Sequence, residues 1–329
     1  MSKLIRHAEL VAGGGTTISE RIRQEPVSEA AQFTRDPGLN VVLGAEGPLG
    51  SVLAERLAAE SKEVRAVFLE RVTGDYGLPQ VQKVVIDALK AGNVVEACKG
   101  AGMIYDCYEP NYSSRKEVWT QVTSNVLLAS IEISAPLVFA SHLLNSESEN
   151  TAMEGDILRA HQSNLVRTVV ARLPQLIGIR VVTPLWKAIY DSVLSGKKAH
   201  WVGDSKVTRS FLDVEDAASA MVLLGENVQC QGRAWNISGP EAMTGTRFIQ
   251  LAFRAVGREP KVGSWGRGVF LTGVLSSEAR EMTHMQYDYY SSFILEGNEF
   301  AEAFPSFRFA TSDESVSKGI EWYRAEFKT

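Results

Sequence analysis

The stretch Asn40-Val41-Val42-Leu43-Gly44-Ala45-Glu46-Gly47-Pro48-Leu49-Gly50 decides the fold class of this 329-residue chain. Its first four residues form a short, mainly apolar run, which is typical of a buried strand. The segment that follows, Ser51–Ala59, has apolar residues at helical spacing. Three glycines therefore stand at the joint between a strand and a helix, where they permit a tight turn and a close approach of the backbone to another group.

A glycine loop in this position is typical of proteins that bind dinucleotides. The helix that begins at the loop presents backbone N–H groups without helical partners, and these attract the phosphates of a cofactor. We therefore predict that Gly44, Gly47, Leu49 and Gly50 contact a dinucleotide, the alternative being a turn that binds nothing. The glycines at 13–15 lack a strand before them and a Lys-Ser/Thr pair after them, so we interpret them as a bend.

Apolar runs and helical segments alternate along the chain up to about Gly178. Strands are predicted at 40–43, 64–69, 81–86, 102–107, 136–140 and 167–173, and helices at 51–59, 93–98, 118–133 and 152–161. Thr151 and Glu154 have the spacing of a capping box at the start of the last of these helices. The alternation predicts an α/β fold with a doubly wound parallel sheet that is covered on both faces.

The regular alternation of strands and helices ends at about Gly178, which indicates a second, smaller region after it. Helices are predicted there at 186–194, 246–256 and 315–327, and short strands at 211–214 and 234–237. We divide the chain into an N-terminal extension at 1–38, a dinucleotide-binding-type domain at 39–178, and a smaller substrate-binding region at 179–329. The last region is expected to be interleaved with the end of the sheet.

The glycine loop resembles that of the extended short-chain dehydrogenase/reductase family, whose members are often NAD-dependent epimerases and dehydratases. The resemblance continues through most of the chain in stretches that follow the family's order, at 84–87, 103–112, 172–178, 209–216, 237–239 and 319–323. It implies a Rossmann-type domain, a C-terminal substrate domain and NAD(P) as cofactor. It also implies that Asp87 lies near the adenine ring. After the second strand, Arg71 would favour a ribose 2′-phosphate and Glu70 a 2′-hydroxyl, unless both are surface charges.

The chain departs from the family's pattern where the family does its chemistry. Family members place a catalytic Tyr on the helix after the fifth strand, with a Lys four residues later that lowers the pKa of the Tyr and holds the ribose. Here Thr151 and Gly155 take these positions, and no tyrosine or lysine occurs between Glu117 and Trp186. A threonine hydroxyl is far too weak an acid to replace a phenol. We therefore expect that the chain does not use the Tyr/Lys hydride mechanism.

The cofactor loop also departs from the family, because Glu46 stands where a small or neutral residue is usual. A carboxylate close to a pyrophosphate would oppose its binding unless the side chain points away. Together with the missing lysine, this residue predicts that NAD(P) binding is weak or absent.

The candidate site lies beyond the carboxyl ends of the strands, as in other open α/β sheets. Tyr108 and Tyr112 follow the fourth strand, and Ser141 and His142 follow the fifth. His142 is the candidate for moving protons near neutral pH, although a packed or solvent-facing histidine is the more common case. The two tyrosines would donate hydrogen bonds to a ligand carbonyl or pack in the core. Ser141 stands where the family carries a catalytic Ser or Thr, but it cannot form a triad with its neighbour in the strand.

Composition excludes several classes of function. The formal net charge of −5 and the lack of a basic run argue against a nucleic-acid partner. Cys98, Cys107 and Cys230 are far apart and the histidines are scattered, so no metal site or disulfide framework is indicated. These isolated cysteines are typical of reduced thiols in a cytoplasmic protein. No apolar run approaches the ~18 residues of a membrane span.

Three functions are consistent with the sequence. The first is a non-redox enzyme that isomerises, cyclises, eliminates or hydrolyses a small organic metabolite. The second is an NAD(P)-dependent reductase or epimerase with a rearranged proton donor, and the third is a non-enzymatic sensor of a dinucleotide or metabolite. The family resemblance further implies a homodimer through the helices at 118–133 and 151–161, with apolar area from Val118, Val122, Leu127 and Leu128.

Overall fold

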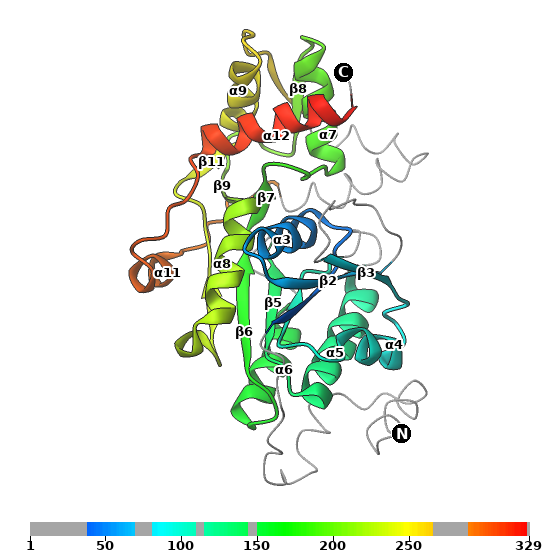
Figure 1. The fold of residues 1–329 in the computed structure, drawn as a ribbon. Coiled ribbons are helices and arrows are strands. Elements are labelled where there is room, and N and C mark those ends of the chain that lie inside the picture. The colour runs from blue at the N-terminus through cyan, green and yellow to red at the C-terminus, as the bar shows by residue number, and fades with distance from the viewer. Residues whose placement is uncertain (1–37, 70–80, 110–114, 144–149, 266–288, 328–329) are drawn as a thin grey trace.

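A computed structural model describes residues 38–69, 81–109, 115–143, 150–265 and 289–327 of the chain. Its centre is a seven-stranded, all-parallel sheet with the order β10-β6-β5-β4-β1-β2-β3. The strands are β1 (Leu39–Leu43), β2 (Glu63–Phe68), β3 (Val81–Val85), β4 (Met103–Asp106), β5 (Leu137–His142), β6 (Thr168–Leu173) and β10 (Ala234–Asn236). Helices cover both faces of this sheet (Figure 1).

Each face of the sheet has its own apolar core. One core lies under α3 (Pro48–Ala59) and α8 (Val214–Glu226) and includes Val42, Leu53 and Leu57. The other lies under α4 (Ala91–Cys98), α5 (Arg115–Ile133) and α6 (Asn150–Gln162) and includes Val41 and Ile104. Neighbouring strand residues thus enter opposite cores, because side chains alternate across a strand. Burial on both faces explains why the inner strands are largely apolar, whereas the edge strand β3 exposes Gln82 and Lys83.

The strand order reverses beside β1, and this reversal positions the candidate site. β1 pairs with β2 on one side and with β4 on the other, with Leu43 in register with Asp106. The crossovers from β1 and β4 therefore leave the sheet toward opposite faces. Open α/β sheets bind their ligands at such a switch point, outside the carboxyl ends of the strands.

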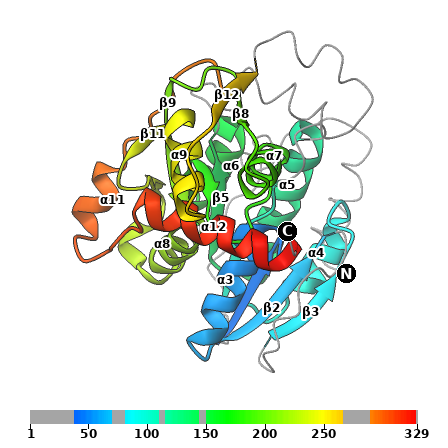
Figure 2. The same ribbon diagram turned by 90° about the horizontal axis from the view of Figure 1, so that it is seen from above.

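Most of the remaining elements form a smaller region above this edge of the sheet (Figure 1, Figure 2). They are β7 (Gln175–Ile177), α7 (Pro184–Leu194), β8 (Ala199–Val202), β9 (Thr208–Asp213), β11 (Ala242–Thr244), α9 (Gly245–Ala255), β12 (Val262–Trp265) and α12 (Ser312–Phe327). They include one sheet of order β11-β9-β7 and a β12-β8 pair. Aromatic side chains fill this region, with the Trp186 ring stacked on Phe248 at 4.3 Å between centroids. Two further short helices lie elsewhere: η2 (Val228–Cys230) follows α8 at the opposite edge of the sheet, and α11 (Asn298–Ala303) packs beside β10.

The structure confirms the predicted doubly wound parallel sheet, with its first β–α turn at Gly44–Gly50. The sequence did not predict α8, which begins directly after β9 and fills one face of the sheet. The predicted capping box is wrong, because Thr151 lies inside α6 and the Glu154 carboxylate binds Ser141 and Arg172 instead.

Two of the apolar residues of α5 that were predicted to form a dimer interface are buried within the chain. Val122 is 2% exposed and Leu127 is 1% exposed, and both belong to the core under α5 within the chain. They are therefore unavailable for an interface. The homodimer stays a proposal that would have to rest on other residues of α5 and α6.

None of the described helices has the length and apolarity needed to cross a membrane. Within the same residues, His, Cys, Asp and Glu side chains form no cluster suited to a metal ion.

Candidate functional site

The glycine loop packs so closely that two of its three glycines are sterically required. Gly44 has a φ of 76°, and a Cβ there would lie 2.7 Å from the backbone of Tyr108. A Cβ on Gly50 would lie 2.2 Å from the carbonyl oxygen of Gly44. At Gly47 the nearest atom to such a Cβ is the Gly44 oxygen, at 3.4 Å. Gly44 and Gly50 thus serve internal packing, whereas Gly47 leaves its outer side open to a ligand.

The first turn of α3 offers hydrogen-bond donors to that open side. Pro48 has no N–H, and the helical ladder begins only where Ser51 N–H donates to Gly47 at 3.0 Å. Between them, the N–H groups of Leu49 and Gly50 have no acceptor in the described part of the chain. Two free donors at a helix N-terminus suit an anionic group such as a phosphate. The residues present therefore fit the phosphates of a dinucleotide.

Glu46 is turned toward β2. Its Oε2 accepts a hydrogen bond from the Leu69 N–H at 3.2 Å, just beyond the end of that strand. In dinucleotide-binding folds the end of the second strand is where the adenosine ribose is recognised. The carboxylate would therefore lie beside the ribose of a bound dinucleotide, rather than being directed only at the phosphates as the sequence suggested.

Asp87, predicted to lie near the adenine ring, forms its contacts with neighbouring residues of the turn that it belongs to. Its Oδ1 accepts from the Leu89 N–H at 3.2 Å, and its Oδ2 is 3.0 Å from Lys90 Nζ. These contacts lower the pKa of Asp87, with the Lys90 hydrogen bond as the main cause. Asp87 also lines an open hollow of about 800 Å³ between β2, β3 and α4. Arg71 and Tyr112, the other predicted site residues near this edge, lie outside the described residues.

Ser141 belongs to a buried network that joins β5, α6 and β6. The Ser141 hydroxyl donates to Glu154 Oε1 at 2.6 Å, and Arg172 donates to Glu154 Oε2 from Nε at 2.9 Å and from Nη2 at 2.6 Å. Ser141 is fully buried and the Glu154 side chain is 5% exposed. A carboxylate this deeply buried needs such partners, because an unpaired charge away from water is costly.

His142 belongs to a different pair at the same edge. Its Nδ1 is 3.5 Å from Glu109 Oε2, and its ring lies 6.3 Å from the Trp119 ring between centroids. The His142 side chain is 4% exposed, whereas that of Glu109 is 37% exposed. Glu109 follows β4 and His142 ends β5, so the pair bridges two neighbouring strand ends. Solvent or a ligand reaches the carboxylate more readily than the imidazole.

Tyr108 and Asp106 are buried residues at the carboxyl end of β4, at the same edge of the sheet. Tyr108 is 9% exposed, and its N–H donates to Asp106 Oδ1 at 3.2 Å. Asp106 is fully buried, and this burial raises the pKa of its carboxyl to about 7, against a smaller opposing effect of the Tyr108 hydrogen bond. Gln175, at the start of β7, accepts from the Tyr289 hydroxyl at 2.8 Å.

The structure thus brings Tyr108 and His142 to one edge with the glycine loop, and it places Ser141 in a separate buried network. Sequence reasoning missed Glu154 and Arg172 as partners of Ser141, and it missed the pairing of Glu109 with His142. Their positions in the sequence could have indicated these contacts, because Glu109, His142 and Arg172 all lie at the carboxyl ends of adjacent strands. Glu154 carried no signal beyond its place on the helix after β5.

Comparison with known proteins supports the family resemblance. Residues 150–238, from the start of α6 past β10, match the model of the NAD dependent epimerase/dehydratase family. Over this segment the chain is similar to that family. No curated protein matches it in sequence. Its α6, the helix after the fifth strand of the sheet in chain order, contains neither Tyr nor Lys.

Several solved structures share the fold. An epimerase from Methanothermobacter thermautotrophicus has a TM-score of 0.72 at 13% identity, covering 88% of this chain and 93% of its own. A dTDP-glucose 4,6-dehydratase from Streptomyces venezuelae, solved with NAD bound, has a TM-score of 0.70 at 16% identity over 87% and 96%. The enzyme WbmH from Bordetella bronchiseptica, solved with NAD+, has a TM-score of 0.64 at 18% identity over 87% and 98%. These likenesses establish an epimerase/dehydratase-like fold.

Proposed function

We propose that the chain is an enzyme that converts a small organic metabolite by a non-redox reaction, such as isomerisation, cyclisation, elimination or hydrolysis. The observation that carries this proposal is the set of side chains that α6 directs toward the sheet. Where the family presents a phenol and an ammonium group, α6 presents the Glu154 carboxylate, already bound by Ser141 and Arg172. Hydride transfer to a carbonyl creates an alkoxide that needs a nearby proton donor, and this network offers none to a substrate.

We assign proton transfer in this reaction to Glu109 and His142. Glu109 is the more exposed member and would exchange the proton with the substrate. His142 lies behind it, within ion-pair distance, and an imidazole can take up or return a proton near neutral pH. Tyr108 borders the same edge and is a candidate hydrogen-bond donor to the substrate.

A dinucleotide is the ligand that the glycine loop supports best. Leu49 and Gly50 would donate to its phosphates, and Gly47 leaves room for their approach. A bound nicotinamide would supply a hydride acceptor, but the reaction proposed here does not draw on it. Because the family's ribose-holding lysine is absent from α6, we propose that NAD(P) binds more weakly here than in family members that have it.

The test is whether product forms without a dinucleotide. Protein stripped of nucleotide is incubated with a metabolite extract, and mass spectrometry identifies substrates that disappear and isomers or fragments that appear. The same conversion is then measured in Glu109→Gln and His142→Ala, with His200→Ala as a histidine control in the smaller region. We expect conversion without added NAD(P)H, and a loss of about 10²–10⁴ in rate for the two site variants only.

Two results would contradict this proposal in different ways. Conversion that requires NAD, or that oxidises NADPH one-for-one with product, would favour the reductase or epimerase with a rearranged donor. Rates that change less than a few-fold in both site variants would refute the assignment of Glu109 and His142, even if the reaction is non-redox.

A sensor that binds a dinucleotide without turnover is the second candidate. The observation that favours it is the combination of an intact glycine loop with a buried ion pair in place of the catalytic groups. Calorimetry with NAD+ and NADH separates the two proposals, because saturable binding with no conversion of any metabolite supports the sensor.

A further inference from the structure

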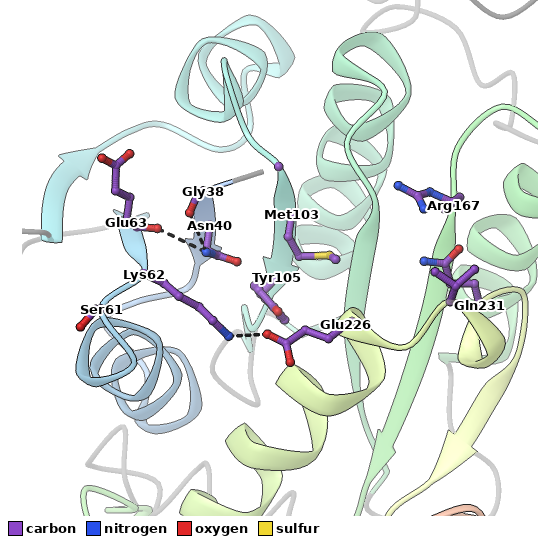
Figure 3. A pocket seen from close by; sticks show the side chains of 13 residues that line it. Gly38, Asn40, Ser61, Lys62, Glu63, Met103, Tyr105, Arg167, Glu226 and Gln231 are labelled. Atoms are coloured by element: carbon purple, nitrogen blue, oxygen red, sulfur yellow. Dashed lines mark hydrogen bonds and ion pairs between the residues drawn. The ribbon is translucent and has the colours of Figure 1, made fainter. Parts of the chain in front are cut away.

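A separate cavity of about 540 Å³ opens at the other edge of the sheet, where the parallel strands begin. Asn40, Glu63 and Met103 line it at the amino ends of β1, β2 and β4, and Arg167 lines it just before β6. The carboxyl end of α8 closes it from one side (Figure 3). The glycine loop lies at the opposite end of β1, roughly 15 Å away for a five-residue strand. This cavity is therefore distinct from the candidate active site.

Tyr105 is the deepest polar residue of this cavity. It is 1% exposed, yet its hydroxyl forms no hydrogen bond with any residue that the structure describes. A buried phenol normally has a hydrogen-bond partner. Gly225, on α8, packs closely against it, because a Cβ on that glycine would lie only 3.1 Å from the hydroxyl oxygen. Burial raises the pKa of Tyr105, so the hydroxyl stays protonated and can donate to a ligand.

Arg167 supplies an uncompensated positive charge. Arg167 is half-buried as a residue, and its guanidinium group has no ion pair or hydrogen bond within the described ranges. Gln231 lies beside it, and its side-chain amide is likewise unbonded there; Figure 3 shows both side chains on the same side of the cavity. The other lining cation, Lys62, forms ion pairs with both Glu226 and Glu60, so its charge is fully used by these carboxylates. The cavity thus pairs a free guanidinium with a free phenol.

An apolar surface lies between these two polar groups. Met103 is 8% exposed and lines the cavity in the strand position two residues before Tyr105, so both side chains project from the same face of β4. Small-molecule sites commonly combine an apolar body with a few polar groups, in volumes of about 300–1,000 Å³. The measured volume falls within this range.

We propose that this cavity binds a small organic acid. Its carboxylate would pair with Arg167 and accept from Gln231, its apolar body would lie on Met103, and a second polar group would accept from Tyr105. A guanidinium group suits a carboxylate because its planar N–H groups match the two oxygens. This site does not depend on dinucleotide binding or on catalysis at the other edge.

Calorimetry with 4-hydroxyphenylacetate as the probe tests this proposal. The probe carries a carboxylate, an apolar ring and a hydroxyl, and its amide, 4-hydroxyphenylacetamide, lacks only the charge. We expect saturable one-site binding of the acid. The amide should bind at least about tenfold more weakly than the acid, because a hydrogen bond to a charged group is lost. Saturating NAD+ should leave the affinity unchanged, since the two edges are separate.

Two variants and one control assign the binding to the cavity. Arg167→Gln should weaken binding by about 10–100-fold, and Tyr105→Phe by about 3–10-fold. Arg247→Gln removes the same charge from an exposed position on α9 and should change nothing. Circular dichroism and the melting temperature establish that each variant is folded. The proposal is overturned if the acid shows no saturable binding at 10 mM or if Arg167→Gln binds it as tightly as the parent. It is equally overturned if NAD+ displaces the acid.

Discussion

At the scale of single residues, Glu46 places a negative charge at the end of β2, where its Oε2 accepts a hydrogen bond from the Leu69 N–H. A negative charge held there repels a second negative charge on the ribose more than it affects a neutral hydroxyl. Glu46 is therefore expected to disfavour NADP+ relative to NAD+.

Glu46→Gln tests this expectation, because the amide oxygen still accepts from Leu69 while the charge is removed. We expect calorimetry to show about tenfold tighter binding of NADP+ and at most about a twofold change for NAD+. Glu259→Gln, at an exposed position, is the matched control for the loss of one negative charge. Equal gains for both dinucleotides would instead indicate that the carboxylate acts on the shared pyrophosphate.

The sequence predicted the position of the glycine loop correctly because the elements on either side of it are adjacent in the chain. The strand, the turn and the helix that define it lie within 20 consecutive residues, from Asn40 to Ala59. The pairing of Ser141 with Glu154 could not be predicted in this way. It depends on how α6 packs on β5, and the Arg172 that completes it arrives from the next strand. Side-chain partners across elements follow from packing geometry, which a single sequence does not contain.

At the scale of elements, the Ser141–Glu154–Arg172 network fastens α6 to β5 and β6. Glu154→Gln keeps the shape but removes the charge that Arg172 binds, and we expect a loss of about 1–3 kcal/mol in the free energy of unfolding. Ser141→Ala should cost about 1 kcal/mol, because a neutral hydroxyl is removed together with its bond. Chemical denaturation of the two single variants and the double variant measures these values.

The double variant decides whether Ser141 and Glu154 act as one unit. Residues in one hydrogen-bond network are non-additive by about 0.5–3 kcal/mol, so the combined loss should be smaller than the sum of the two single losses. As a control, Ser219→Ala removes a hydroxyl that bonds only within α8. Strict additivity of Ser141→Ala and Glu154→Gln would show that the two side chains do not depend on each other.

Element prediction succeeded for long, periodic segments and failed where elements are short or directly joined. The six strands predicted before Gly178 all exist as β1 to β6, because each of them contains closely spaced apolar residues. The helix α8 escaped detection because Asp213 both ends β9 and caps α8, where it accepts from Glu215 N–H at 2.8 Å. Strands of three or four residues, such as β8 and β12, are defined by partners about 60 residues apart in the chain.

At the scale of the whole molecule, one sheet carries two chemically different edges. The carboxyl edge holds the glycine loop and the Glu109–His142 pair, and the amino edge holds Arg167 and Tyr105. β4 connects them directly, because Tyr105 lines the cavity at one edge and Asp106 borders the other. Neighbouring side chains on this strand face opposite cores, so each edge can bind its own ligand without sharing a side chain.

The stability of the whole fold should fall as the pH rises toward neutrality, and Asp106 is the main reason. Burial raises the pKa of Asp106 from 3.8 to about 7 and that of Asp216 to about 6. The folded state therefore binds more protons than the unfolded state between about pH 4 and pH 7. Linkage then requires the free energy of unfolding to decrease across this window. The neutral carboxyls contribute fully below the unfolded pKa, and their contribution is lost as the pH passes the folded pKa.

Asp106→Asn separates this contribution from that of other groups. The amide oxygen still accepts from the Tyr108 N–H, and no charge has to be buried at high pH. Chemical denaturation measures the free energy of unfolding of both proteins at pH 5 and at pH 8. Between these two pH values, the variant should lose less of this free energy than the parent. The two proteins should therefore differ more at pH 8 than at pH 5. Asp204→Asn, at an exposed turn, should leave the pH dependence unchanged. If Asp106→Asn follows the same pH curve as the parent, the Asp106 carboxyl is already ionised in the folded protein at pH 5, and the buried edge of β4 must stabilise its charge through a contact other than the Tyr108 N–H.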